Sequence, residues 1–174
     1  LVHELSIVAQ SIEASLSEKD VIAEKVEKLL ATTRNAFYIG RGSDYYVSME
    51  ASLKLKEISY IQCEGFAAGE LKHGTISLIE DGVPVLALIS NHPHLASHTR
   101  GNIQEVVSRG ANVLTIVDEA VAKEEDDITV TTVHPFLSAI AMVVPTQLIA
   151  YYATLQRGLD VDKPRNLAKS VTVE

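Results

Sequence analysis

Three charged residues recur at helical spacing between positions 44 and 60. Glu50, Lys54 and Glu57 follow one another at i, i+4 and i+7, so on an α-helix they stack as one column. A partly desolvated carboxylate beside a lysine is a candidate general base. The alternative is a set of surface ion pairs, each contributing only tenths of a kcal/mol. The pattern alone leaves both interpretations open.

The rest of this predicted helix has two apolar arcs. One arc holds Tyr46, Met49, Leu53 and Tyr60, and the other holds Val47, Ala51, Leu55 and Ile58. The side opposite the charged column carries small or polar residues, namely Ser48, Ser52, Lys56 and Ser59. We expect this serine-rich side to face solvent. The charged column, flanked by apolar residues on both sides, is then predicted to form the wall of a cleft.

The polar segment 163–174 carries a second kind of reactive group. It contains Lys163, Arg165 and Lys169 and follows a long apolar segment. Composition alone favours a solvated chain terminus there. A lysine amine can form a Schiff base with a carbonyl compound, but composition alone does not assign that role to Lys169.

The histidines have weaker chemical signatures. His73 lies in a segment bracketed by glycines, where a lone histidine is usually a surface residue. His92, His94 and His98 have a spacing that is compatible with metal binding. No carboxylate or cysteine completes that set, so we expect a solvated helix start and no metal.

The segment 40–44, Gly-Arg-Gly-Ser-Asp, joins a predicted strand to the N-terminus of a helix, a place where anions often bind. The carboxylate of Asp44 would repel a phosphate at this position. We therefore expect Asp44 or Ser43 to act as a helix N-cap and the phosphate of any ligand to bind elsewhere.

Composition excludes some classes of protein. The chain has 174 residues and a formal net charge of -8, which disfavours nucleic acid and anionic membranes as partners. Cys63 is the only cysteine, so no internal disulfide is possible. The apolar segment 135–155 is interrupted by Pro145, Thr146 and Gln147, and we expect a buried helix, not a bilayer span. The chain begins with Leu1 and lacks a signal-peptide pattern, so we expect a piece of a longer protein.

The order of predicted elements indicates the fold class. Helices are predicted at 2–16, 19–32, 44–60, 93–109 and 135–156, and strands at 35–40, 83–90, 112–117 and 128–133. Near-continuous aliphatic runs are typical of strands buried on both faces of a parallel sheet. Strands that alternate with helices predict an α/β fold with right-handed crossovers.

Two blocks, residues 51–74 and 163–174, carry a resemblance that extends over essentially the whole chain. The chain resembles the C-terminal end of the glutamine–fructose-6-phosphate aminotransferase (glucosamine-6-phosphate synthase) family. The resemblance implies a sugar isomerase (SIS) domain, a flavodoxin-like three-layer sandwich with a parallel sheet flanked by helices. It implies the second of two SIS domains at 1–160 and, at 161–174, a C-terminal tail that closes over the sugar. The first SIS domain and the glutaminase domain would lie on the same parent chain.

The resemblance also assigns roles to residues. It implies that Glu57 is the proton-shuttling base, with Glu50 and Lys54 in the same isomerase site. It implies that His73 opens the sugar ring in the neighbouring subunit, which makes a homodimer part of the mechanism. It further implies that Lys169 forms the Schiff base with open-chain fructose 6-phosphate and that Ala168 lines the sugar site through its backbone.

The expected activity is therefore conversion of fructose 6-phosphate and glutamine-derived ammonia to glucosamine 6-phosphate, in the cytoplasm and without a metal or organic cofactor. We expect the isolated fragment to have little or no activity, since the phosphate-binding loop would lie in the first SIS domain. The alternative is a non-catalytic SIS module that senses a sugar phosphate. That alternative predicts a phosphate-binding Ser/Thr cluster within this chain and has no use for a lysine tail. A simple sugar-phosphate isomerase would also lack this tail.

Overall fold

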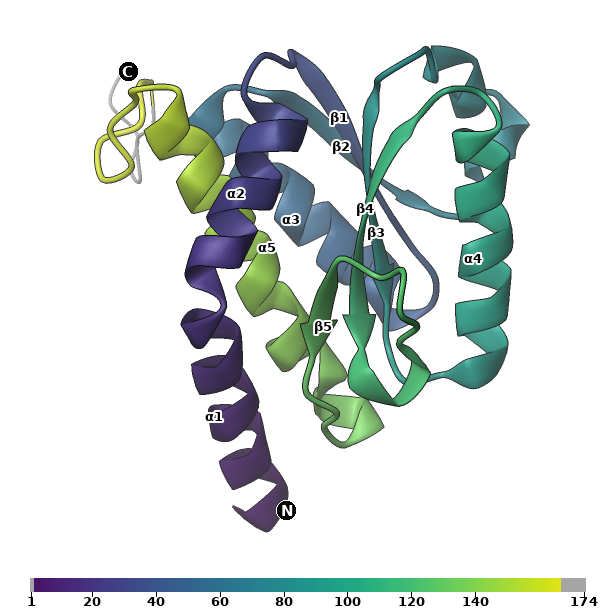
Figure 1. Cartoon of the computed structure of the whole chain (residues 1–174), viewed down its shortest axis with the longest axis vertical. Coiled ribbons are helices and arrows are strands. Elements are labelled where there is room, and N and C mark those ends of the chain that lie inside the picture. The colour runs from purple at the N-terminus through teal and green to yellow at the C-terminus, as the bar shows by residue number, and fades with distance from the viewer. Residues whose placement is uncertain (1, 167–174) are drawn as a thin grey trace, which may run out of the picture.

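The computed structural model describes residues 2–166, which form a parallel sheet between two layers of helices (Figure 1). The helices are α1 (Val2–Ser17), α2 (Lys19–Leu30), α3 (Ser43–Ser59), α4 (Pro93–Val107) and α5 (Ser138–Gln156). The strands are β1 (Asn35–Gly40), β2 (Gln62–Ala67), β3 (Pro84–Ile89), β4 (Asn112–Asp118) and β5 (Ile128–Val130). Short 3₁₀ turns occupy Leu71–His73, Thr75–Leu78, Glu119–Val121 and Pro135–Leu137.

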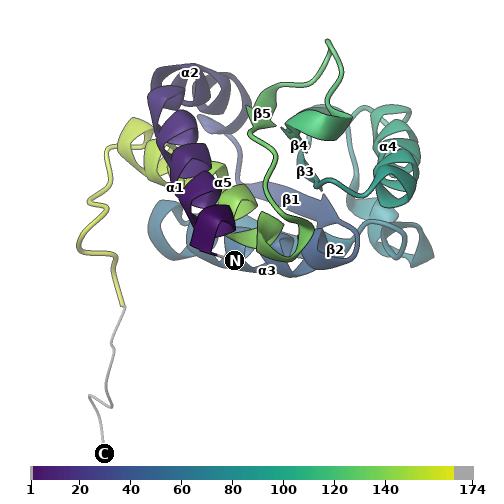
Figure 2. The ribbon, with the colours of Figure 1, turned by 90° about the horizontal axis from the view of Figure 1, so that it is seen from below.

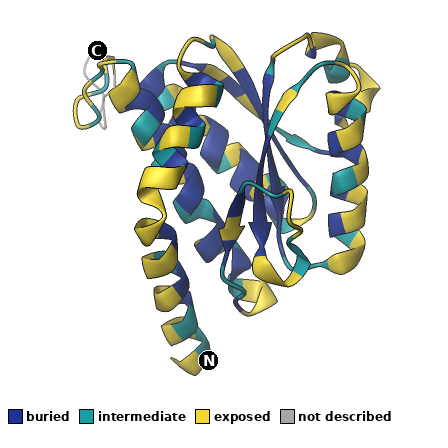
Figure 3. Ribbon diagram, viewed as in Figure 1, coloured by how far each residue is buried: buried dark blue, intermediate teal, exposed yellow. Residues whose placement is uncertain are grey.

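The sheet has the strand order β2-β1-β3-β4-β5, and all its strand pairs are parallel. Helices α1, α2, α3 and α5 cover one face and α4 covers the other (Figures 1 and 2). The predicted three-layer α/β sandwich is confirmed. The aliphatic runs explain why the central strands lie inside: every residue of β3 is buried, as are the last five of β1 (Figure 3).

The edge strand β2 is not among the strands predicted from the sequence. Its residues pair in register with β1, from Asn35 opposite Gln62 to Gly40 opposite Ala67. The segment has exposed polar positions and an internal glycine, Gly65, which together conceal the strand pattern. The conformation of β2 is therefore set by its pairing with β1 and not by its own composition.

Helix α3 approaches the sheet very closely. A Cβ atom on Gly40 would lie 2.6 Å from the backbone of Asp44, and one on Gly65 would lie 2.6 Å from the carbonyl oxygen of Ser48. The serine-rich side of α3 was expected to face solvent, and this expectation is wrong for Ser48, Ser52 and Ser59, which are buried. Small side chains on the helix and glycines on the strands allow this contact.

Two of the three buried serines have hydrogen-bond partners, whereas the buried hydroxyl of Ser48 has none within the described residues. The hydroxyl of Ser52 donates to the carbonyl oxygen of Met49, and that of Ser59 donates to the carbonyl oxygen of Leu55. Because the serine side faces inward, one of the predicted apolar arcs faces outward. Its members Tyr46, Met49 and Leu53 are exposed. Lys56 is exposed, as predicted.

The apolar C-terminal helix α5 belongs to the core. The segment Pro135–Gln156 is the one described helical stretch that is long and apolar enough to cross a membrane. In the fold, its buried residues Met142 and Ile149 join the same cluster as Leu55 of α3 and Val26 of α2. This packing confirms the prediction of a buried helix.

The close contact between α3 and β2 predicts a stability difference between two glycine substitutions. Gly65→Ala should lower the free energy of unfolding by about 1–3 kcal/mol, because the new methyl group meets the α3 backbone. Gly101→Ala, in α4, has no atom within 4 Å of the new methyl group and should raise stability by about 0.5–1 kcal/mol. Urea denaturation of both variants checks this, and equal effects would contradict the packing of α3.

Candidate active site

The charged column predicted on α3 is present in the structure. The Nζ atom of Lys54 lies 2.8 Å from Oε2 of Glu57 and 3.8 Å from Oε1 of Glu50. The side chain of Glu57 is 24% exposed and that of Glu50 is 45% exposed. Glu57 is thus the more sheltered carboxylate and the better candidate for a general base.

Lys54 serves this column as a positive charge. The hydrogen bond to Glu57 raises the pKa of the Lys54 amine, and the charges of Glu57 and Glu50 act in the same direction. An amine must be neutral to attack a carbonyl carbon, and a raised pKa makes the neutral form rarer. The geometry therefore favours Lys54 as a charged partner of the carboxylates over Lys54 as a nucleophile.

A groove of about 590 Å³ runs beside the column, between α3 and β2. It is lined mainly by apolar atoms, with Tyr46, Met49 and Leu53 from the exposed arc and Phe66 from the strand. Glu50 is the member of the column that borders this groove. Lys54 and Glu57 do not line this groove, so the prediction that the whole column forms the wall of a cleft is not borne out by it.

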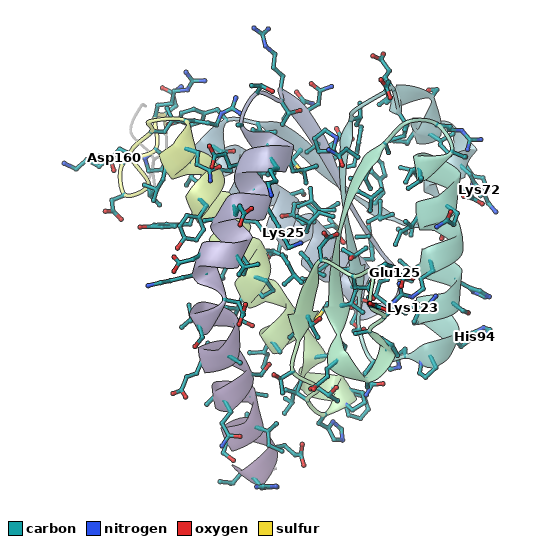
Figure 4. All side chains as sticks on the ribbon, viewed as in Figure 1. Lys25, Lys72, His94, Lys123, Glu125 and Asp160 are labelled. Carbon is teal, nitrogen blue, oxygen red and sulfur yellow. The ribbon has the colours of Figure 1, made fainter. Side chains whose placement is uncertain are left out.

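His73 lies apart from the column, in the 3₁₀ turn Leu71–His73 that follows β2. Its Nδ1 atom is 2.9 Å from Oε2 of Glu70, and its side chain is 62% exposed. The neighbouring Leu71 is buried and fixes the turn to the core, while Lys72 extends into solvent (Figure 4). The turn therefore presents the imidazole outward, where a second molecule can reach it.

The loop between β1 and α3 differs from the expected capping arrangement. Gly42, with φ of 60°, occupies the N-cap position, so the prediction of Asp44 or Ser43 as N-cap is wrong. Asp44 lies within the first turn, and its Oδ2 atom accepts a hydrogen bond of 2.8 Å from the backbone N–H of Ser90. Burial raises the pKa of the Asp44 carboxyl. The Asp44 carboxylate thus bonds the residue that follows β3, and its other oxygen is buried without a partner among the described residues. Its negative charge in the first turn of α3 disfavours an anion beside it.

The histidines of α4 form no metal centre in the described part of the chain. The rings of His94 and His98 are tilted by 58° to each other, with their centroids 4.4 Å apart. His94 points away from the start of α4 into solvent (Figure 4). No group of three or more His, Cys, Asp or Glu side chains within residues 2–166 is arranged to hold a metal ion.

The start of the C-terminal tail contacts the end of α3. The backbone N–H of Arg165 donates a 2.8 Å hydrogen bond to the hydroxyl of Tyr60, and the guanidinium carbon lies 4.1 Å from the centre of the tyrosine ring. The sequence pattern places Tyr60 only on an apolar arc and gives no sign of this contact. Ala168 and Lys169, the tail residues for which the resemblance implies roles, lie outside the described residues.

A parallel sheet of order 2-1-3-4-5 with helices on both faces defines a flavodoxin-like α/β domain. The SIS domain family matches residues 29–157, and the chain belongs to this family. Two sequence relatives, each bearing the name glutamine–fructose-6-phosphate aminotransferase [isomerizing], are 80% identical in Streptococcus mutans and 81% identical in Streptococcus agalactiae serotype V. Both alignments cover all 174 residues of this chain, which spans 29% of the length of those relatives.

Solved structures give the same result for the fold. The C-terminal domain of glucosamine-fructose-6-phosphate aminotransferase from Francisella tularensis superposes with a TM-score of 0.85 and 32% identity. The match covers 92% of this chain and 46% of that one. Glucosamine-6-phosphate deaminase from Thermotoga maritima superposes with a TM-score of 0.74 and 26% identity, covering 93% of this chain and 48% of that one.

The buried carboxyl of Asp44 predicts a pH dependence of stability. Its pKa in the folded state is raised above the value of about 3.9 expected in the unfolded chain. The folded state therefore binds more protons between these two values, and the contribution of Asp44 to stability falls as pH rises through that window. Asp44→Asn removes this titration, while the amide oxygen still accepts from the Ser90 N–H.

The stability of the wild type relative to Asp44→Asn should therefore decline from about pH 4 upward and become constant above the raised pKa. Urea denaturation of both proteins across this pH range measures the difference between their free energies of unfolding. The contributions of the other carboxyl groups are the same in both proteins and cancel in this difference. Parallel stability curves for the two proteins would show that Asp44 does not titrate differently in the folded state.

Proposed function

We propose that this chain is the second SIS domain of a glutamine–fructose-6-phosphate aminotransferase. The observation that carries the proposal is the identity of about 80%, over all 174 residues, with proteins that bear this name. The proposed reaction uses fructose 6-phosphate and glutamine-derived ammonia and yields glucosamine 6-phosphate. The parent chain would hold a first SIS domain and a glutaminase domain, with residues 1–160 as the second SIS domain and 161–174 as its tail.

The α3 column has the groups that the isomerisation step requires. Once ammonia has replaced the oxygen at C2, a proton must move from C1 to C2 to convert the ketose imine to the aldose amine. Glu57 is the proposed carrier of this proton, since it is the more sheltered carboxylate of the pair. Lys54 holds Glu57 through the 2.8 Å hydrogen bond, and Glu50 lies at the border of the neighbouring groove.

Lys169 is the proposed Schiff-base lysine, with Ala168 lining the sugar through its backbone. The state of Lys54 supports this division of roles, because the raised pKa of Lys54 suits a charge partner and not an attacking amine. Arg165 at the start of the tail contacts Tyr60, three residues beyond Glu57, so the tail begins beside the charged column.

His73 is proposed to open the sugar ring in the site of a second subunit. Its outward position on the turn after β2 is compatible with a contribution to another molecule. The protein would therefore act as a homodimer. We propose a cytoplasmic location, and the net charge of -8 argues against nucleic acid and anionic membranes as partners.

The sensor alternative has less support. A phosphate-sensing module needs a free anion site at the carboxyl ends of the strands. At the N-terminus of α3 this place holds the carboxylate of Asp44, which already accepts a hydrogen bond from Ser90. The phosphate is therefore proposed to bind to the first SIS domain, and the isolated fragment is expected to have little or no activity.

Glu57→Gln in the full-length enzyme should preserve sugar binding and lower the isomerisation rate by roughly 10²–10⁴-fold. The amide keeps the size of the side chain and accepts the hydrogen bond from Lys54, but it cannot take up the C1 proton. The exchange of the C1 hydrogen of bound sugar with deuterated solvent measures the step directly. Exchange at the wild-type rate would assign the base elsewhere, with Glu50 as the next candidate.

Lys169 should be labelled when the full-length enzyme is treated with fructose 6-phosphate and borohydride, which reduces the imine to a stable secondary amine. Lys169→Arg keeps the charge but cannot form the imine, so labelling and activity should both be lost. Peptide mapping locates the adduct. An adduct on Lys54 or Lys72, with an active Lys169→Arg variant, would refute the proposed role of the tail.

A further inference from the structure

The side chain of Arg41 connects the loop between β1 and α3 to helix α4. Its Nε and Nη2 atoms donate hydrogen bonds of 3.1 Å and 2.9 Å to the same acceptor, the Oδ1 atom of Asn102. Asn102 is buried in α4, and its Nδ2 atom donates a 3.1 Å hydrogen bond to Oε2 of Glu105. Because a guanidinium group is planar and rigid, two hydrogen bonds to one fixed oxygen determine its orientation.

The same guanidinium packs against Gly69, in the turn that follows β2. A Cβ atom on Gly69 would lie 2.6 Å from Nη2, 3.1 Å from Cζ and 3.2 Å from Nη1 of Arg41. The backbone of Gly69 is outside the left-handed region, so its φ angle does not require a glycine. The space that Arg41 occupies is therefore the reason why a side chain is disfavoured at this position.

The turn at Gly69 leads directly to His73. The backbone N–H of His73 donates a 3.0 Å hydrogen bond to the carbonyl oxygen of Glu70, which closes the turn. Within the turn, Leu71 is buried in the same apolar cluster as Ile103 of α4. The turn is thus attached to the α4 side of the domain at two points, an apolar one at Leu71 and a polar one at the guanidinium group.

We propose that Arg41 is a positioning residue that holds residues 69–73 against α4 and thereby sets where the His73 imidazole is presented. This inference rests on the proposed function, because it takes His73 to be the residue that opens the sugar ring. The side chain of His73 is 62% exposed, so its location depends on the turn that carries it. The contact at Leu71 fixes one point of that turn, and the guanidinium at Gly69 fixes a second point and with it the orientation.

Two substitutions of Arg41 in the full-length enzyme separate positioning from charge. Arg41→Met removes the charge and both hydrogen bonds to Asn102. Arg41→Lys keeps the charge, but its single nitrogen cannot replace the planar group that bonds Asn102 and packs against Gly69. Arg109→Met is the control, since it removes an exposed arginine that bonds to residues at the other end of α4.

Arg41→Met and Arg41→Lys should each lower kcat by roughly 10- to 100-fold, because a misplacement of about 1 Å can cost a reaction 10²-fold. The KM for fructose 6-phosphate should change little, since the phosphate is proposed to bind to the first SIS domain. In a His73→Ala background neither substitution should lower kcat further, because Arg41 acts through His73. Arg109→Met should keep the wild-type kcat.

Two results would overturn the proposal. Wild-type kcat in Arg41→Lys would show that Arg41 acts by its charge and not by its shape. Equal losses from Arg41→Met in the presence and absence of His73 would show that Arg41 acts independently of this histidine.

Hydrogen exchange followed by mass spectrometry tests the turn without relying on activity. Arg41→Met should accelerate exchange in peptides that cover residues 68–74, where the backbone N–H groups of Glu70 and His73 are hydrogen-bonded, and should leave peptides from β3 unchanged. If His73→Ala has wild-type activity, the proposed role of His73 fails, and exchange alone then decides on the positioning. Faster exchange in residues 68–74 would support it, and unchanged exchange would overturn it.

Gly69→Ala provides a second variant if Arg41→Met does not fold. Its methyl group meets the end of the flexible Arg41 side chain, so the guanidinium can move aside at little cost to stability. The same loss of kcat and the same faster exchange are expected. Wild-type values of both in Gly69→Ala would overturn the proposal.

Discussion

The structure depends on the close contact between α3 and the sheet. Gly40 and Gly65 leave no room for a Cβ atom against α3, and Ser48 and Ser52 fill the interface from the helix side. A larger residue at any of these positions would push the helix outward or rotate it. Since successive residues of a helix differ by about 100° in direction, this contact decides which arc of α3 is exposed.

The charged column and the apolar groove both lie beside the exposed arc of α3. Lys54 is hydrogen-bonded to Glu57, and Glu50 borders the groove that β2 completes. The same helix ends at Tyr60, where Arg165 returns to it from the tail. A single helix therefore carries the candidate base, its charge partner and the attachment point of the tail.

Much of the fold follows from the sequence, but the orientation of α3 does not. The aliphatic runs that form β3 and β4 are long enough to predict buried strands, and the helices between them predict the parallel topology. The spacing of Glu50, Lys54 and Glu57 predicts the column. Serine, however, is common both on surfaces and in tight helix contacts, and the glycines of the neighbouring strands, Gly40 and Gly65, decide between the two locations. The contact of Tyr60 with Arg165 joins residues 105 positions apart and has no local signal.

The titration of the Lys54 amine is the most direct test of whether Lys54 is the charged partner of Glu57. Carbon-13 labelling of lysine side chains allows the titration to be followed by NMR in the wild type and in Glu57→Gln. If Glu57 holds the Lys54 charge, the Lys54 pKa lies above the ordinary value of about 10.4 in the wild type and falls clearly in the variant. The same pKa in both proteins would show that Glu57 does not hold this charge, and the column would then be a set of independent surface residues.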